Sequence, residues 1–144
     1  MALFMRSFQA TRLSPSIDGN DAIVNKFITL MTNIVIESLT NPRKILSSMD
    51  VAMIMYGFQR MGSNNPLVCA LLLALVPKVE SCREALGAQE VGNALYGMQG
   101  MSSDSAEVHA MLSALVPKVK SCGESLDAQH VGNAIYGMQG MSSD

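Results

Sequence analysis

The chain has 144 residues, a formal net charge of −2 and 49% hydrophobic residues. This apolar content is enough to build a core and excludes wholesale disorder. The charge gives no strongly basic surface of the kind that most nucleic-acid-binding proteins carry, which counts against RNA binding by this segment alone. The longest uninterrupted apolar run, Val68 to Val76, has nine residues. Because a bilayer needs roughly 20, we expect no membrane span and no membrane partner.

The N-terminal segment has a biased composition. The first seventeen residues contain Arg6 and Arg12 and several hydroxyl residues, with no acidic residue before Asp18. This composition is typical of a mitochondrial or plastid transit peptide, and an ordinary flexible terminus is the alternative. We expect residues 1–20 to be a flexible leader and the protein to act in one of these organelles, with the cytoplasm as the alternative.

The segment after this leader is a weak copy of a later part of the chain. Ile28 to Ile36 aligns loosely with Val68 to Val76, and Asn41 to Ser48 aligns with Ser81 to Ala88. Both alignments use a shift of forty residues. We interpret residues 21–47 as a degenerate half-repeat.

The same shift relates the rest of the chain. Leu72 to Asp104 and Leu112 to Asp144 differ at about seven positions, and Met49 to Met61 aligns with Gln89 to Met101. Such a period indicates a supersecondary unit that stacks on its neighbours. We predict repeats over 48–87 and 88–127 and a partial repeat over 128–144, which lacks its second helix. We therefore expect an array that is truncated.

Each unit has the pattern of two helices. In the first, the A helix, Val91, Ala94, Leu95 and Met98 follow helical spacing, and Gly100 is placed to end it. Val51 to Phe58 and Val131 to Met138 are the equivalent segments. After a turn and N-cap cluster at Ser102 to Ser105 comes the B helix, with apolar positions from Val108 to Val119. Pro117 predicts either a kink or an end at Val116. The fold expected is all-α, since no strand pattern of useful length occurs.

Chemistry-bearing motifs are absent from the sequence. Cys69, Cys82 and Cys122 have no CxxC spacing, and we expect reduced thiols. These cysteines with His109 and His130 lack zinc-ligand spacing. No glycine-rich phosphate loop, GxSxG or HExxH occurs. We therefore expect no enzyme activity, no cofactor, no metal and no small-molecule substrate.

The A helix carries a family resemblance. The sequences AQEVGNALYGMQGM at Ala88 to Met101 and AQHVGNAIYGMQGM at Ala128 to Met141 resemble the octotricopeptide repeat. The resemblance covers roughly two thirds of the chain, with tyrosines where that family usually has tryptophan. It implies a right-handed α-solenoid of about forty-residue helix-turn-helix repeats. It also implies binding of single-stranded RNA and a role in organellar RNA stability, processing or translation.

Eight residues are candidates for RNA binding on the A helices and the turns after them. Asp50, Glu90 and His130 occupy one equivalent position, which differs in every copy. Such variation is expected of a repeat protein in which each unit recognises a different base, although neutral drift would give the same pattern. Asn93 and Asn133 offer a donor and an acceptor to a base edge, or could instead bond to a neighbouring repeat. The candidates are Asp50, Arg60, Glu90, Asn93, Gln99, His130, Asn133 and Gln139.

Other repeated residues have two interpretations each. Tyr96 and Tyr136 could stack on bases or pack between layers. Gly92 and Gly97 indicate close helix crossing or a ligand. Lys78 and Lys118, with Lys120 and Arg83, could attract phosphate or complement a helix dipole. The whole array could equally be a protein-interaction scaffold, or a non-functional fragment.

Overall fold

The computed structural model describes residues 19–141, and this part of the chain is helical without any strand. The expected all-α class is confirmed. The proposed transit peptide falls almost wholly within residues 1–18, outside the described residues. The six helices are α2 (Gly19–Thr40), α3 (Ser48–Gly57), α4 (Pro66–Ser81), α5 (Ala88–Tyr96), α6 (Ala106–Lys120) and α7 (Ala128–Gly137).

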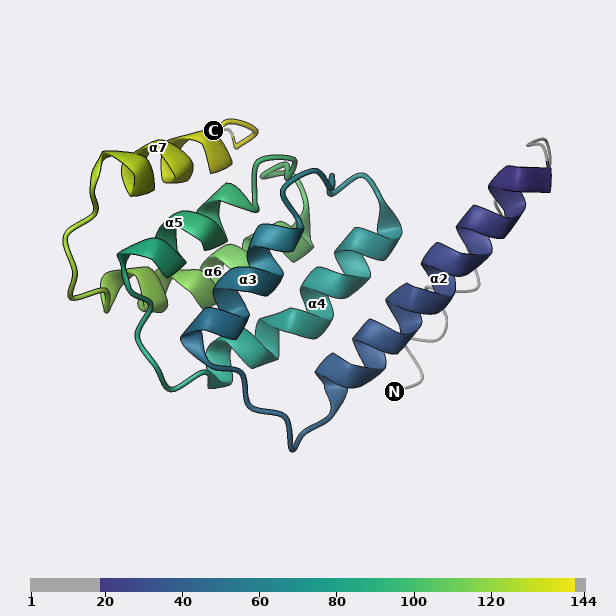
Figure 1. Cartoon of the computed structure of the whole chain (residues 1–144), viewed down its shortest axis with the longest axis horizontal. Coiled ribbons are helices and arrows are strands. Elements are labelled where there is room, and N and C mark those ends of the chain that lie inside the picture. The colour runs from purple at the N-terminus through teal and green to yellow at the C-terminus, as the bar shows by residue number, and fades with distance from the viewer. Residues whose placement is uncertain (1–18, 142–144) are drawn as a thin grey trace. The chain divides into compact units, whose positions relative to one another are not determined.

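The chain divides into two units, residues 1–31 and 32–144, with the boundary inside α2. Within the second unit the helices alternate between two rows. The A helices α3, α5 and α7 contact one another in sequence order, and the B helix α4 contacts α6. Figure 1 shows α3, α5 and α7 side by side. Helices forty residues apart in the chain are therefore neighbours in space.

Polar residues at the helix starts explain where the helices begin. The Ser47 side chain caps α3. At the start of α4, the Asn65 side chain accepts a hydrogen bond from the Leu67 amide. Pro66, the first residue of α4, has no amide hydrogen and therefore needs no capping partner. The Ser105 hydroxyl accepts from the Val108 amide at the start of α6. The turn and cap predicted at Ser102 to Ser105 is thus present.

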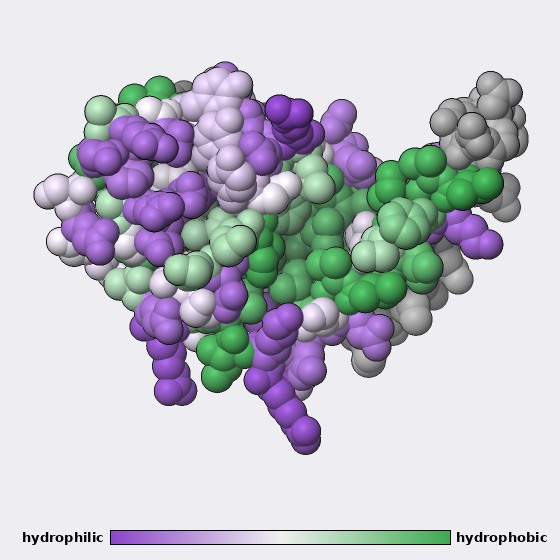
Figure 2. Space-filling view, in the orientation of Figure 1, coloured by the Kyte–Doolittle hydropathy of each residue, from purple (hydrophilic) through white to green (hydrophobic). Residues whose placement is uncertain are grey.

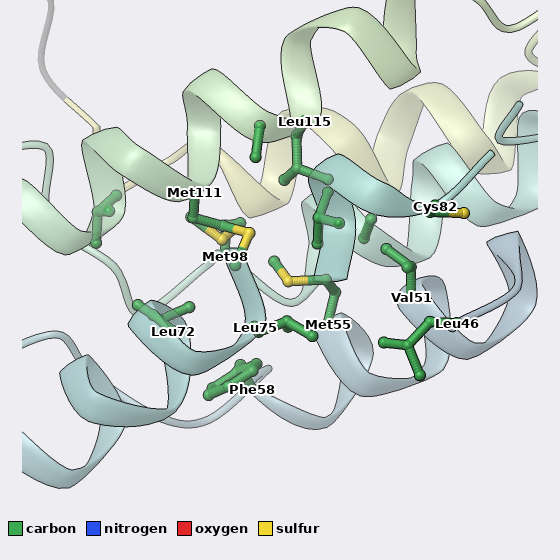
Figure 3. Close-up of a cluster of buried hydrophobic side chains, with 14 of the residues drawn as sticks. Leu46, Val51, Met55, Phe58, Leu72, Leu75, Cys82, Met98, Met111 and Leu115 are labelled. Carbon is green, nitrogen blue, oxygen red and sulfur yellow. The ribbon is translucent and has the colours of Figure 1, made fainter. Parts of the chain in front are cut away.

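The two rows enclose one hydrophobic core. Figure 3 shows Met55 of α3, Leu72 and Leu75 of α4, and Met111 and Leu115 of α6 in this cluster. Each of these side chains is at most 2% exposed. At roughly 25 cal/mol per Å² of apolar surface removed from water, this burial is the main force that holds the helices together.

Both B helices continue through their prolines. α4 extends beyond Pro77 to Ser81, and α6 extends beyond Pro117 to Lys120. Of the two alternatives for Pro117, a kink or an end at Val116 with a short extension, the second does not hold, because α6 runs without a break to Lys120. Pro117 cannot donate to the Ser113 carbonyl, but both residues are exposed, so water can satisfy that oxygen.

The A helices end earlier than their glycines suggest. α5 ends at Tyr96, and the chain then turns through Gly97 to Gly100. The Met98 amide bonds to the Leu95 carbonyl and the Met101 amide to the Met98 carbonyl, at 2.9 Å each. Hydrogen bonds between residues three apart are typical of 3₁₀ turns, so the α-helix has already ended before Gly100. The prediction that Gly100 ends the helix is wrong by one turn.

α2 bears on the expectation that the chain has no segment able to span a membrane. Ala22–Thr40 is long and apolar enough to cross a membrane, by length and composition. The search for uninterrupted apolar residues missed it because Asn25, Lys26 and Asn33 interrupt the run. Core helices and N-terminal signal sequences satisfy the same criterion, so it assigns no membrane role. Figure 2 shows the apolar surface of this helix, which exposes Ile23, Val24, Phe27, Ile28, Leu30, Met31, Ile34 and Val35.

Candidate functional site

The position that varies between copies is the third residue of each A helix. Asp50 and His130 each complete a capping box with the residue before the helix, Ser47 and Asp127 respectively. Glu90 has the same place in α5, where Gly87 offers no side-chain cap. The variation therefore coincides with a change in how each helix start is capped.

Asp50 is held tightly by its cap. Its carboxylate accepts hydrogen bonds from the Ser47 amide at 3.0 Å and the Ser47 hydroxyl at 2.8 Å. The backbone hydrogen bond from Ser47, then the one from its side chain, lower the pKa of Asp50 below its ordinary value of 3.8. This carboxylate is committed to the helix start, which reduces its use as a reader of bases.

His130 has a local partner of the same kind. Its Nδ1 lies 3.0 Å from the Asp127 carboxylate, and its backbone amide donates to that carboxylate at 2.9 Å. Its Cα also lies near Gly92 of α5, where an added methyl would sit 3.3 Å away. His130 thus belongs to the contact between α5 and α7 as well as to the outer surface.

Two glutamates in the links cap the A helix of their own unit. The Glu84 carboxylate accepts from the Ser48 amide at 2.8 Å, and the Glu124 carboxylate accepts from the Ala88 amide at 2.7 Å. Sequence reasoning missed both residues. Their exact repetition after forty residues was the available signal, because a cap that the unit supplies to its own A helix repeats with the unit.

The amides of the A helices are not engaged by the protein. Asn93 and Asn133 are half-buried, and their side chains form no hydrogen bond within residues 19–141. The side chains of Gln99 and Gln139, in the turns after α5 and α7, also have no such bond in that range. The expected bond from the asparagines to a neighbouring unit is therefore not found, and their donors and acceptors remain available.

The three tyrosines form a continuous stack across the A helices. The ring centroids of Tyr56 and Tyr96, and of Tyr96 and Tyr136, are 5.5 Å apart, with planes inclined by 19° and 22°. Both faces of the Tyr96 ring are therefore covered by other rings. Packing between layers is the role that this geometry supports, and a base can reach only the ring edges or the outer faces at either end.

Arg60 follows α3 at an exposed position where the other copies have glycine. A methyl group added at Gly100 would overlap the Met61 carbonyl, and one added at Gly140 would meet the Met101 carbonyl at 2.8 Å. Gly100 and Gly140 are thus required by contact with the preceding unit. Arg60 is free of that requirement among the described residues, and its guanidinium is available for an anion.

The two repeated lysines hold the backbone of the preceding link. Lys78 is 7% exposed, and its ammonium donates to the Asn41 carbonyl at 2.6 Å and the Lys44 carbonyl at 2.7 Å. The Lys118 ammonium donates in the same way to the Cys82 carbonyl. Neither lysine is presented to phosphate, whereas Lys120 and Arg83 are exposed.

The cysteines are free thiols, as expected from their spacing. Burial, and next the charge of Glu107, raise the pKa of the Cys69 thiol above its ordinary value of 9.0. A raised pKa keeps this thiol protonated and unreactive at neutral pH. Within residues 19–141 no group of three or more histidine, cysteine or acidic side chains is placed to hold a metal ion.

Comparison of the chain with protein-family models, with curated proteins and with solved structures gives no match.

Proposed function

We propose that this chain is a right-handed α-solenoid of about forty-residue helix-turn-helix repeats that binds single-stranded RNA along its A helices. Its role would be in the stability, processing or translation of organellar RNA. The mechanism is steric: the protein holds a transcript segment extended and shields it from nucleases, without chemistry of its own.

The observation that carries this proposal is the pair of unengaged amides at Asn93 and Asn133. They occupy equivalent places on α5 and α7, which are in contact. An amide offers a donor and an acceptor together, which is what the edge of a base requires. Glu90 and His130 lie three residues earlier on each helix and therefore on the same face. Two such pairs in succession support reading of successive bases.

The charge distribution supports weak binding. Lys78 and Lys118 are held by carbonyl groups, whereas Arg60, Arg83 and Lys120 are exposed cations. Few phosphate contacts mean a modest electrostatic contribution. Two full units and one partial unit can engage only two or three bases, so we expect low affinity from the chain of 144 residues.

The test is RNA affinity against salt, measured by fluorescence anisotropy with a labelled random-sequence single-stranded RNA. Binding should weaken as salt rises, with a slope of about −0.7 for each phosphate contacted. The double variant Asn93→Ala/Asn133→Ala should lose most of the affinity. Asn33→Ala is the control, since Asn33 also has no side-chain hydrogen bond in the described part but lies on α2, outside the A helices. Salt-independent binding, or equal affinity for the double variant, would contradict the proposal.

A protein-interaction scaffold is the second candidate, and two residues of α3 favour it. Met49 and Met53 are 61% and 66% exposed, where α5 has Gln89 and Asn93. Methionine is an adaptable contact for apolar peptides. Retention of an amphipathic peptide, abolished by Met53→Gln and unaffected by salt, would favour this function. A chain that retains neither RNA nor peptide would fit the third possibility, a non-functional fragment.

A further inference from the structure

α7 exposes apolar residues whose equivalents are buried in the other A helices. Val131 is 42% exposed, whereas Val91 and Val51 are 1% exposed. Met138 is 45% exposed, whereas Met98 is fully buried. Ile135 is 63% exposed. These residues form a stacking surface that no described helix covers.

The contact between α5 and α7 has three defined points. His130 approaches Gly92, Gly137 lies against the Leu95 carbonyl, and Gly140 approaches the Met101 carbonyl. Two of these points recur forty residues earlier, since Gly97 lies against the Met55 carbonyl and Gly100 against the Met61 carbonyl. The interface between A helices is therefore a fixed pattern, with an accepting side and an incoming side.

Among the described residues, the accepting side of α7 and the incoming side of α3 have no A helix packed against them. We define the accepting face as Gly132, Ile135 and Met141, and the incoming face as Asp50, Gly57 and Arg60. Within the described residues no atom lies within 4 Å of a methyl built at Gly132 or at Gly57. Their equivalents Gly92 and Gly97 are both in close contact. Within residues 19–141, both halves of this interface therefore occur without a partner.

We infer that a second copy of this chain docks head to tail, with the incoming face of its α3 on the accepting face of α7. Gly57 then lies against the Ile135 carbonyl, and Asp50 approaches Gly132, as in the contact between α5 and α7. The occupant is a second copy because the two faces continue an interface that the chain already uses, in the same register. A head-to-tail contact of this kind leaves a free face on each new copy, so it extends beyond a dimer.

Arg60 is a steric mismatch in the docked pair. Its equivalents are glycines, and a methyl at Gly100 would overlap the carbonyl it faces. In the docked register Arg60 meets the Met141 carbonyl, which lies after the last helix and must shift. Association is therefore weaker than the internal contacts, and removal of this side chain should strengthen it.

The experiment is analytical ultracentrifugation of the 144-residue chain over a range of concentrations. The average mass should rise with concentration beyond that of a dimer. Gly132→Leu should weaken association at least about tenfold, equivalent to ~1.4 kcal/mol. This substitution leaves the monomer folded, since its site is open and leucine is a better helix former than glycine. Gly123→Leu is the matched control, because Gly123 also has no described atom within 4 Å but lies in the link before α7.

A second variant tests whether the two copies dock in the proposed register. Arg60→Gly should strengthen association, since it restores the glycine of the internal interface. A chain that stays monomeric at every concentration would overturn the inference. An assembly that stops at a dimer and is unaffected by Gly132→Leu and Arg60→Gly would also overturn it. RNA binding does not enter this measurement, so the inference is tested separately from the proposed function.

Discussion

Gly97 of α5 lies so close to the carbonyl oxygen of Met55 on α3 that any side chain at that position would overlap it. The same relationship recurs after forty residues in α7. The spacing of the A helices is therefore set by backbone contact at a glycine. This contact explains why a residue that disfavours helices is repeated at the ends of α5 and α7.

Gly97→Ala should destabilise the fold by about 1 to 3 kcal/mol, because the helices must move apart to admit the methyl group. Gly57→Ala is the matched control, since no described atom lies within 4 Å at that site. It should leave stability unchanged or raise it by up to about 1 kcal/mol. The measurement is urea unfolding at low protein concentration. Equal effects of the two substitutions would show that backbone contact does not set the helix spacing.

Lys78→Met should destabilise the fold by about 1.5 to 3 kcal/mol, the typical worth of hydrogen bonds to a charged group. Methionine keeps the apolar stem but loses the bonds to the Asn41 and Lys44 carbonyls. The link between α2 and α3 should then exchange its amide hydrogens faster. Lys120→Met is the control, since Lys120 is exposed and forms no hydrogen bond within residues 19–141. An equally small effect of both substitutions would show that the hydrogen bonds from Lys78 to the link do not stabilise the fold.

The periodic pattern was sufficient to predict the helices but not their ends. The spacing of Val108, Met111 and Leu115 depends only on one buried face, and α6 buries all three. The end of α5 depends on what lies beyond the helix, because Gly100 contacts Met61 of the preceding unit. Similarly, whether Pro117 ends the helix depends on whether water can reach the carbonyl that this proline leaves without a donor. Such facts come from tertiary contacts, which no local pattern contains.

The candidate site was predictable to a similar degree. Repetition drew attention to Lys78 and Lys118, but neither the phosphate role nor the helix-dipole role considered for them includes their hydrogen bonds to carbonyls of the preceding link, at positions such as Asn41 and Cys82. Composition alone could not decide between a phosphate and a carbonyl as the partner, because both are oxygen acceptors. The capping role of Asp50 could have been predicted from the sequence, since Ser47 stands three residues earlier, as a capping box requires.

Glu124→Ala should destabilise the fold by about 1 kcal/mol, the usual loss when a helix cap is removed. Gly87 provides no side-chain cap for α5, so the Glu124 carboxylate is the cap of this helix start. Hydrogen exchange of the first amides of α5 should accelerate in the variant. Glu80→Ala, at an exposed position without a hydrogen bond in the described part, should leave exchange unchanged.

Asp50 should make stability depend on pH. Because hydrogen bonds from Ser47 lower its pKa below 3.8, the ionised carboxylate stabilises the fold at and above that pH. The stabilisation is lost as the pH falls through the lowered pKa. The difference in Tm between the protein and Asp50→Asn should therefore be constant from neutral pH down to about 4 and shrink below it. A difference that persists unchanged at lower pH would contradict this role.

Tyr96→Leu should cost more than Tyr96→Phe, because only leucine removes both ring contacts of the tyrosine stack. Each aromatic pair contributes about 0.5 to 1.5 kcal/mol beyond its buried area, so phenylalanine should keep most of the stability. The chain has no tryptophan, so tyrosine dominates its near-ultraviolet circular dichroism. That signal should fall in Tyr96→Leu by more than the loss of one ring, since Tyr56 and Tyr136 lose their common neighbour. If the remaining signal were simply two thirds of the original and both variants were equally stable, the stack would contribute nothing to the order of the A helices.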